Sequence, residues 1–115
     1  MMNIKRGDVI LTDLEPIKGS EQGKTRPCLV IQNDLGNMAS PTTIVAAITS
    51  KTEREYPFTV FVQKGEGNIP NDSLILCNHL RTISKEHRII KKSGALEETT
   101  MKKVDDALKT SLALE

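Results

Sequence analysis

The chain has 115 residues and carries 16 Lys and Arg against 15 Asp and Glu, which gives a formal net charge of +1. This length suits one domain with a modest hydrophobic core, so we expect a single domain over residues 1–115. A charge so close to zero provides no global basic field for indiscriminate nucleic-acid binding. One Tyr, two Phe and no Trp are too few for an aromatic platform that binds single strands without sequence preference.

The two cysteines, Cys28 and Cys77, lie in apolar runs without a Cys-x-x-Cys spacing. We interpret them as reduced thiols in the core of an intracellular protein. No recognised ligand spacing joins them to His79 or His87 in a metal site. No apolar run reaches the ~18 residues of a membrane span, and no signal peptide leads the chain. We therefore expect a cytoplasmic protein without a metal or another cofactor.

The first half of the chain predicts three strands. Residues 9–11 form an apolar run, and residues 13–25 follow as a polar loop. That loop is too long for a hairpin turn, and such lengths favour a functional or mobile segment. Two further short, β-branched runs, 28–31 and 44–48, are bounded by turn residues, as is typical of strands buried on both faces. Residues 34–41 between them are expected to form turns.

The second half predicts more strands and then a helix. Residues 58–62 alternate loosely as a strand, 63–72 are hydrophilic, and 73–77 form a buried strand that 78–83 continue or turn at a corner. Residues 87–91 are expected to form a short last strand.

From Leu96 onward the period of the apolar residues becomes helical. The stripe consists of Met101, Val104, Leu108 and Leu112, with charged residues on the other side. Glu97 and Glu98 suit the positive end of a helix dipole, and Leu96 can pack on Met101. Many short strands with one terminal amphipathic helix predict a mainly β fold, a small curved sheet or barrel, rather than a βαβ fold.

The register between the second and third strands brings two polar residues together. Strands adjacent in sequence usually pair antiparallel, and a register that sets Val30 against Val45 sets Arg26 against Thr49. Opposed residues share a face of the sheet, so a guanidinium and a hydroxyl meet at the mouth of the hairpin. Pro27 helps to hold the forked Arg26 donor in one orientation, which suits a phosphate.

Three other side chains suit nucleic-acid chemistry. His79 shares a strand face with Cys77, and histidine titrates near neutral pH, so it suits a proton carrier or a base contact. Arg81 can pair with a carboxylate or help to form a phosphate-binding rim. Tyr56 is an ordinary rim residue that can also stack on an unpaired base. Because no Ser/His/Asp or Cys/His set has supporting context, phosphate chemistry here requires a substrate with its own nucleophile, as RNA has in its 2′-OH.

Several stretches, taken in order along the chain, match one family. They are Lys5–Val9, Gly19–Gly23, Arg26-Pro27, Leu29–Asp34, Ser40–Thr42, Ile48-Thr49, Asp72-Ser73, Leu80–Ile83 and Lys103–Leu112. On these stretches the chain resembles the MazF/PemK (Kid-like) family of toxin endoribonucleases from type II toxin–antitoxin pairs.

The resemblance implies an SH3-like β-barrel of the MazF/PemK/CcdB type with a C-terminal amphipathic helix, assembled as a homodimer. It implies metal-independent cleavage of single-stranded RNA at short sequences in mRNA, without a cofactor, leaving a 2′,3′-cyclic phosphate and a 5′-OH. It also implies growth arrest on expression and neutralisation by a cognate antitoxin whose tail covers the RNA groove. The toxin–antitoxin complex is expected to bind DNA.

The family's catalytic residues carry over onto Arg26 and Thr49. Several relatives have an acidic residue, often followed by Gln, where this chain has Asn78 and His79. We assign these two positions to acid–base chemistry or base reading. The loops 14–25 and 50–57, with the corner at 78–82, are expected to choose the bases. The predicted RNA-binding residues are Ser20, Glu21, Gln22, Lys24, Lys51, Tyr56 and Arg81.

Two alternatives remain open on the sequence alone. One is a barrel toxin like CcdB, which binds a protein target such as DNA gyrase without ribonuclease activity. Those toxins use a C-terminal tip that contains Trp, whereas this chain ends Ser111–Glu115 without any Trp. The other is an SH3-like interaction module without catalysis.

Overall fold

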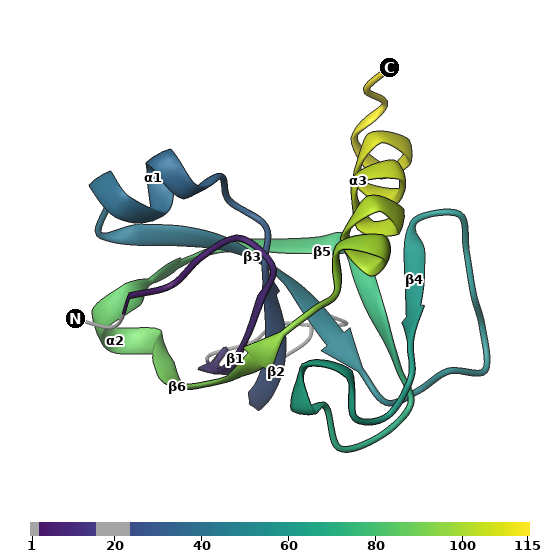
Figure 1. Ribbon diagram of the computed structural model, residues 1–115, viewed down its shortest axis with the longest axis horizontal. Coiled ribbons are helices and arrows are strands. Elements are labelled where there is room, and N and C mark those ends of the chain that lie inside the picture. The colour runs from purple at the N-terminus through teal and green to yellow at the C-terminus, as the bar shows by residue number, and fades with distance from the viewer. Residues whose placement is uncertain (1–2, 16–23) are drawn as a thin grey trace.

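The computed structural model describes residues 3–15 and 24–115, and in these parts of the chain six strands form one sheet. The strands are β1 (Asp8–Asp13), β2 (Thr25–Val30), β3 (Thr42–Thr49), β4 (Thr59–Val62), β5 (Ser73–Ser84) and β6 (Ile89–Ala95). The helical elements are α1 (Asp34–Ala39), the 3₁₀ turn η1 (Glu66–Asn68), α2 (Lys85–Arg88) and α3 (Glu98–Leu112). The strand order is β4-β5-β3-β2-β1-β6, and each of these neighbours pairs antiparallel (Figure 1).

The sheet curls until the turn after β4 meets β6 at the opposite edge. The Asn68 side-chain amide donates to the Ser93 carbonyl at 2.7 Å. Gly67 has φ +61°, and a Cβ there would lie 2.7 Å from a methyl carbon of Val9, so the contact needs a glycine. The expected mainly β fold, a strongly curved sheet with a C-terminal helix, is confirmed.

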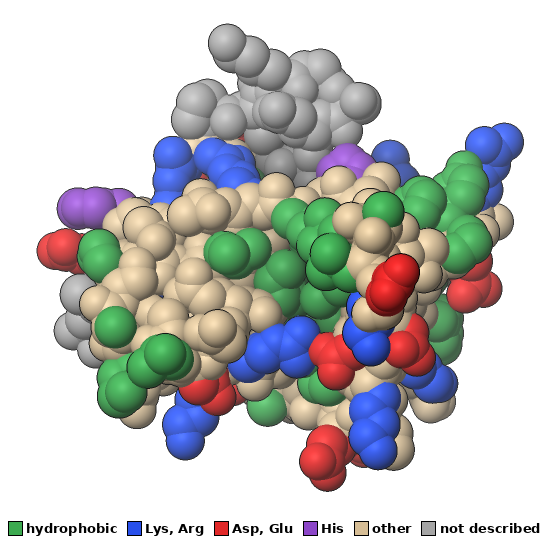
Figure 2. All heavy atoms as spheres, turned by 90° about the horizontal axis from the view of Figure 1, so that it is seen from above, with side chains coloured by type: hydrophobic (Ala, Val, Ile, Leu, Met, Phe, Trp, Pro, Cys, Tyr) green, Lys and Arg blue, Asp and Glu red, His purple; other side chains and the backbone are tan. Residues whose placement is uncertain are grey.

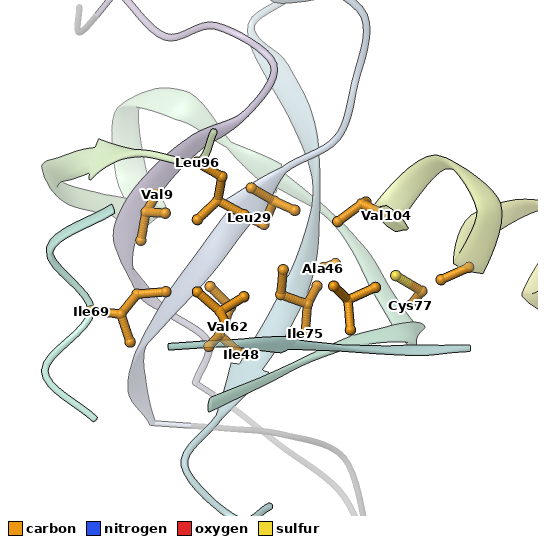
Figure 3. Close-up of a cluster of buried hydrophobic side chains, with 12 residues drawn as sticks. Val9, Leu29, Ala46, Ile48, Val62, Ile69, Ile75, Cys77, Leu96 and Val104 are labelled. Atoms are coloured by element: carbon orange, nitrogen blue, oxygen red, sulfur yellow. The ribbon is translucent and has the colours of Figure 1, made fainter. Parts of the chain in front are cut away.

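Hydrophobic side chains fill both faces of the central strands. One cluster contains Leu29 and Ala46 and is covered by Val104 of α3 (Figure 3). A second cluster contains Cys28 and Val45, from the alternate positions of the same strands. The two apolar runs of the sequence are therefore continuous, because successive residues point into different clusters.

The predicted register between β2 and β3 is confirmed from Cys28 to Val30. Cys28 lies opposite Ala47 and Val30 lies opposite Val45. The residues that join these strands differ from the prediction, because they contain the helix α1 instead of turns only. The Asn33 side chain caps this helix by accepting from the Gly36 N–H at 2.7 Å.

The last part of the sheet also differs in detail from the prediction. β5 continues through the expected corner to Ser84, and it bends there, since Cys77, Asn78 and His79 lie between the paired residues Leu76 and Leu80 as an irregularity of the ladder. The final strand begins at Ile89 rather than at residue 87, because α2 precedes it.

The helix α3 packs on the sheet along the predicted stripe, except at its end. Val104 and Ala107 are buried, and Met101 packs against the same cluster. Leu112, which the stripe placed against the barrel, is 51% exposed, because the helix extends beyond the sheet. No helix in the described ranges combines the length and the apolar character that a membrane crossing requires.

The side of the molecule that carries α1 and α3 shows acidic and basic side chains interspersed rather than gathered by sign (Figure 2). Large hydrophobic side chains are exposed at the two helices: Leu35 and Met38 of α1 are 72% and 80% exposed, and Leu114 after α3 is 61% exposed. Exposed apolar groups of this kind suit contact with a partner.

Candidate active site

Arg26 and Thr49 lie at the open end of the β2–β3 hairpin, where β2 begins and β3 ends. The last paired residues before this end are Cys28 and Ala47. Extended by two residues along each strand, this register predicts Arg26 opposite Thr49, on the face that Cys28 occupies. Arg26 is half-buried and Thr49 is buried at 5% exposure. This end of the hairpin lies on the lower side of Figure 1, away from α1.

The Thr49 hydroxyl is held by the chain that follows it. Its oxygen accepts a hydrogen bond from the Lys51 backbone N–H at 3.2 Å. A hydroxyl that accepts in this way keeps its proton for donation to a further acceptor. The side chain can therefore donate to a phosphate oxygen without losing the bond that orients it.

A second guanidinium belongs to the same face. Burial raises the pKa of the Cys28 thiol to about 11, and a hydrogen bond from Thr12 and the positive charges of Arg81 and Arg26 oppose this rise. Both arginines thus lie within electrostatic range of one thiol. The thiol itself stays protonated at neutral pH and does not act as a nucleophile.

Arg81 also supports the end of β1. It lies opposite Val45 in the β3–β5 ladder, and its Nη1 donates to the Leu14 carbonyl at 2.6 Å. The structural partner expected from the sequence is a carboxylate, whereas the partner found is this backbone carbonyl. The assignment of Arg81 to RNA binding stays a prediction, since a guanidinium has further donors.

Asn78 and His79 lie in the irregular part of β5. Asn78 is exposed and His79 is half-buried. On β3 this part of the strand faces Ala46 and Ala47, two to three residues before Thr49. Bulges often re-aim side chains beside active sites, and this position is compatible with either predicted role.

The structure separates the other predicted RNA-binding residues into two groups. Ser20, Glu21 and Gln22 lie outside the described residues. Lys24 and Lys51 are exposed, and they lie two residues along the chain from Arg26 and Thr49, respectively. Tyr56 is 45% exposed and stacks on Phe58, with ring centroids 5.1 Å apart, so one face of its ring is already covered.

Sequence reasoning missed a cavity of about 200 Å³ beside Arg26. Its wall includes Ser50 and also Pro70 and Asn71, from the segment before β5. This segment comes to the open end because Thr49 pairs with Leu74. A prediction of the register between β3 and β5 from the sequence could have located this cavity.

The candidate metal ligands of the sequence do not converge. Cys28 and Cys77 belong to separate hydrophobic clusters. Among residues 3–15 and 24–115, no three His, Cys, Asp or Glu side chains are grouped as a metal ion would require.

Comparisons with known proteins give consistent results over the whole chain. The sequence model for PemK-like, MazF-like toxins of type II toxin–antitoxin systems matches residues 5–112. Endoribonuclease EndoA of Bacillus subtilis is 49% identical over 114 residues, which are 98% of this chain and 97% of that protein.

Solved structures share the fold at lower sequence identity. MazF from Deinococcus radiodurans matches with a TM-score of 0.83 and 21% identity, over 99% of this chain and 100% of that chain. A mycobacterial endoribonuclease, solved with its cognate antitoxin, matches with a TM-score of 0.80 and 23% identity, over 97% of each chain. At these identities the two structures support the fold alone.

Proposed function

We propose that this protein, which belongs to the PemK-like, MazF-like family of toxins from type II toxin–antitoxin systems, cleaves single-stranded RNA at short specific sequences. The observation that supports the proposal is the β2–β3 pairing from Cys28 to Val30, whose register, extended to the strand ends, would set Arg26 opposite Thr49. The full-length relative EndoA is itself named an endoribonuclease. This similarity favours RNA cleavage over a CcdB-like toxin that binds only a protein target.

The reaction uses a nucleophile that the substrate supplies. The 2′-OH oxygen attacks the adjacent phosphorus, its proton leaves, and the bond from phosphorus to the 5′ oxygen breaks. The products are a 2′,3′-cyclic phosphate and a 5′-OH that has taken up a proton. Neither step requires a metal ion or another cofactor, so we expect cleavage without either.

Arg26 and Thr49 hold the scissile phosphate and stabilise the negative charge of its five-coordinate transition state. The Arg26 guanidinium acts as a forked donor and not as a base, because arginine stays protonated. We assign proton transfer to His79, since histidine titrates near neutral pH. Asn78 is assigned to base contacts.

The remaining assignments concern binding and partners. Ser20, Glu21, Gln22, Lys24, Lys51, Tyr56 and Arg81 are proposed to contact the RNA. We propose a homodimer, to which the exposed apolar side chains of the two helices lend support. We also propose a cognate antitoxin, as in the mycobacterial complex and the MazE–MazF structures, DNA binding by that complex, and a cytoplasmic location.

The test is cleavage of a long RNA by the purified protein with Mg²⁺ and with EDTA. We expect equal cutting in both, and products that end in a cyclic phosphate and a 5′-OH. A matched oligonucleotide with one 2′-deoxy residue at the cut should resist, whereas the same change one nucleotide away should not. Cleavage of an all-DNA oligonucleotide, or no cleavage of any RNA, would refute the proposal.

A further inference from the structure

An exposed aromatic side chain, Phe61, lies on the same face of the sheet as Thr49. Thr49 of β3 pairs with Leu74 of β5, and Leu74 in turn pairs with Phe61 of β4. Directly opposed residues of neighbouring strands share a face, so the three side chains form one row across three strands. Because neighbouring strands lie ~4.8 Å apart, the row places the backbone of Phe61 about 10 Å from that of Thr49.

Phe61 is accessible, whereas the other two residues of this row are buried. Thr49 and Leu74 are 5% and 1% exposed, but Phe61 is 45% exposed. Its neighbours on β4, Val60 and Val62, are buried in the hydrophobic cluster that α3 covers. Since successive side chains of a strand point to opposite faces, the Phe61 ring meets solvent on the side of the sheet that carries the proposed active site.

The backbone of Phe61 is also open, since β4 forms one edge of the sheet (Figure 1). The Cys77 N–H donates to the Phe58 carbonyl at 3.0 Å, so the bonds to β5 fall at Phe58 and at every second residue after it. Phe61 therefore turns its N–H and C=O away from β5, and neither bonds to any described residue. The opposite edge is covered, because the Asn68 amide donates to the Ser93 carbonyl of β6.

The surroundings of the ring on its own face are polar. Thr59, two residues before Phe61 on β4, shares its face, and the exposed Gln63 follows the end of the strand. Phe61 is thus a single aromatic group rather than part of the large apolar patch that is typical of protein-docking surfaces. A lone ring between polar groups suits a flat ligand with a polar edge, and an unpaired nucleobase has this form.

The aromatic residue predicted from the sequence, Tyr56, is placed differently. Its ring stacks on Phe58, with centroids 5.1 Å apart. Phe58 bonds to Cys77, which belongs to the cluster that α3 covers, so Phe58 lies on the face opposite to that of Thr49. The strand position of Phe61, by contrast, directs its ring to the face of Thr49.

We infer that the Phe61 ring stacks on an unpaired base of the RNA, in a nucleotide close to the cut. The inference rests on the proposed RNA cleavage. Single-stranded RNA is bound in part by stacking its splayed-out bases on aromatic side chains. Every base has a π-face, so Phe61 supplies affinity and orientation rather than base preference.

The experiment measures RNA affinity by fluorescence anisotropy for the full-length protein and its Phe61→Ala and Phe61→Trp variants. The probe is the oligonucleotide with a 2′-deoxy residue at the mapped cut, which is not cleaved. Phe61→Ala should bind it about tenfold more weakly, whereas Phe61→Trp keeps an aromatic face and should bind like the parent. Ile90→Ala is the matched control, since Ile90 is 52% exposed on the other edge strand, β6, and should change nothing.

A second measurement identifies the stacked base. In the same probe the bases on both sides of the cut are replaced one at a time by abasic residues. One abasic position should weaken binding of the parent about tenfold but leave binding of Phe61→Ala unchanged, because the variant has already lost that contact. The slope of log affinity against log salt should be the same for parent and variant, because no phosphate contact is lost.

The outcomes separate this inference from the proposed function. If the parent protein cuts RNA and Phe61→Ala binds every probe as the parent does, the inference is wrong and the proposed function stands. If Phe61→Ala weakens binding equally for all probes and lowers the mass found by sedimentation, Phe61 contacts a protein chain and the inference is wrong. If the parent protein cuts no RNA, both are wrong.

Discussion

The two ends of the β2–β3 hairpin use their polar side chains in opposite ways. At the end closed by α1, Asn37 is 4% exposed, and its side-chain oxygen accepts from Gln32 at 3.1 Å and from Thr43 at 2.6 Å. Its amide nitrogen donates to the Gln32 carbonyl and to Asp34, and Lys85 donates to its backbone carbonyl. Every polar atom of the Asn37 side chain is bonded within the protein.

At the open end, the Thr49 and Asn71 side chains keep hydrogen-bonding groups that a ligand can use. The Thr49 hydroxyl accepts from one backbone N–H and keeps its proton. The Asn71 amide faces outward without a partner in the described parts of the chain, and Lys24 is held in a left-handed conformation. The closed end therefore stabilises the fold, and the open end keeps donors for a ligand.

The largest effect that this comparison predicts is on catalysis at the open end. Arg26→Ala should remove on the order of 3 kcal/mol of transition-state stabilisation, or about 10²–10³ in rate, as the loss of an oxyanion donor does. The midpoint of urea unfolding should change little. Single-turnover cleavage of a fixed RNA measures the rate. Arg26→Lys keeps the charge without the fork and should recover only part of it, and parental cutting by Arg26→Ala would contradict the role.

At the closed end the same kind of truncation should affect stability instead. Asn37→Ala leaves the buried Thr43 hydroxyl and the Gln32 amide without this partner, so we expect a loss of about 2 kcal/mol in the free energy of unfolding. Urea titration measures it. Ala39→Ser is the matched control on α1, since Ala39 is exposed and its substitution should change little. At a temperature where Asn37→Ala is folded, its cleavage sites should equal those of the parent.

The open end could be predicted from the sequence because local patterns determine it. Two β-branched runs pair with apolar residues opposite apolar residues, and this fixes the register from Cys28 to Val30 on which the proposed Arg26/Thr49 pair rests. The closed end could not. Helix α1 is short and contains Gly36, so its intrinsic propensity is low. It forms because Asn33 caps it and because Thr43, just after the helix, and Lys85, which is distant in sequence, bond to Asn37.

The cavity could not be predicted for a related reason. Its wall depends on the pairing of Thr49 with Leu74 and on the turn at 65–73, and neither leaves a periodic signal in the sequence. The apolar stripe of the C-terminal helix predicted one contact too many. It included Leu112, which is exposed because α3 extends beyond the sheet at that point. A period shows which side of a helix is apolar, but not where the surface beneath it ends.

At the open end, substitution of Lys24 should change RNA affinity and stability in different directions, with effects smaller than that of Arg26→Ala on the rate. Lys24→Gly removes a cation and also relieves the left-handed backbone, so the protein should gain up to about 1 kcal/mol of stability. RNA affinity should fall, and the slope of log affinity against log salt should decrease by about 0.7, as for one lost phosphate contact on a single strand. Lys24→Ala loses the same charge but keeps the strained backbone, so it should bind as weakly without the gain. Unchanged affinity in both variants would remove Lys24 from the site.

The smallest predicted effect is a pH dependence at the closed end. The Arg6 backbone N–H donates to the Asp34 carboxylate at 2.6 Å, and this bond, with a second from Asn37, lowers the pKa of Asp34. A lowered pKa contributes stability that is present above the unfolded-state pKa of ~3.9 and is lost as pH falls through the folded-state pKa. The carboxylate is exposed, so the effect is small. Asp34→Asn should therefore lose less stability than the parent between about pH 5 and about pH 3. Urea midpoints at both pH values measure this, and equal losses would show that the two hydrogen bonds do not stabilise the charged form.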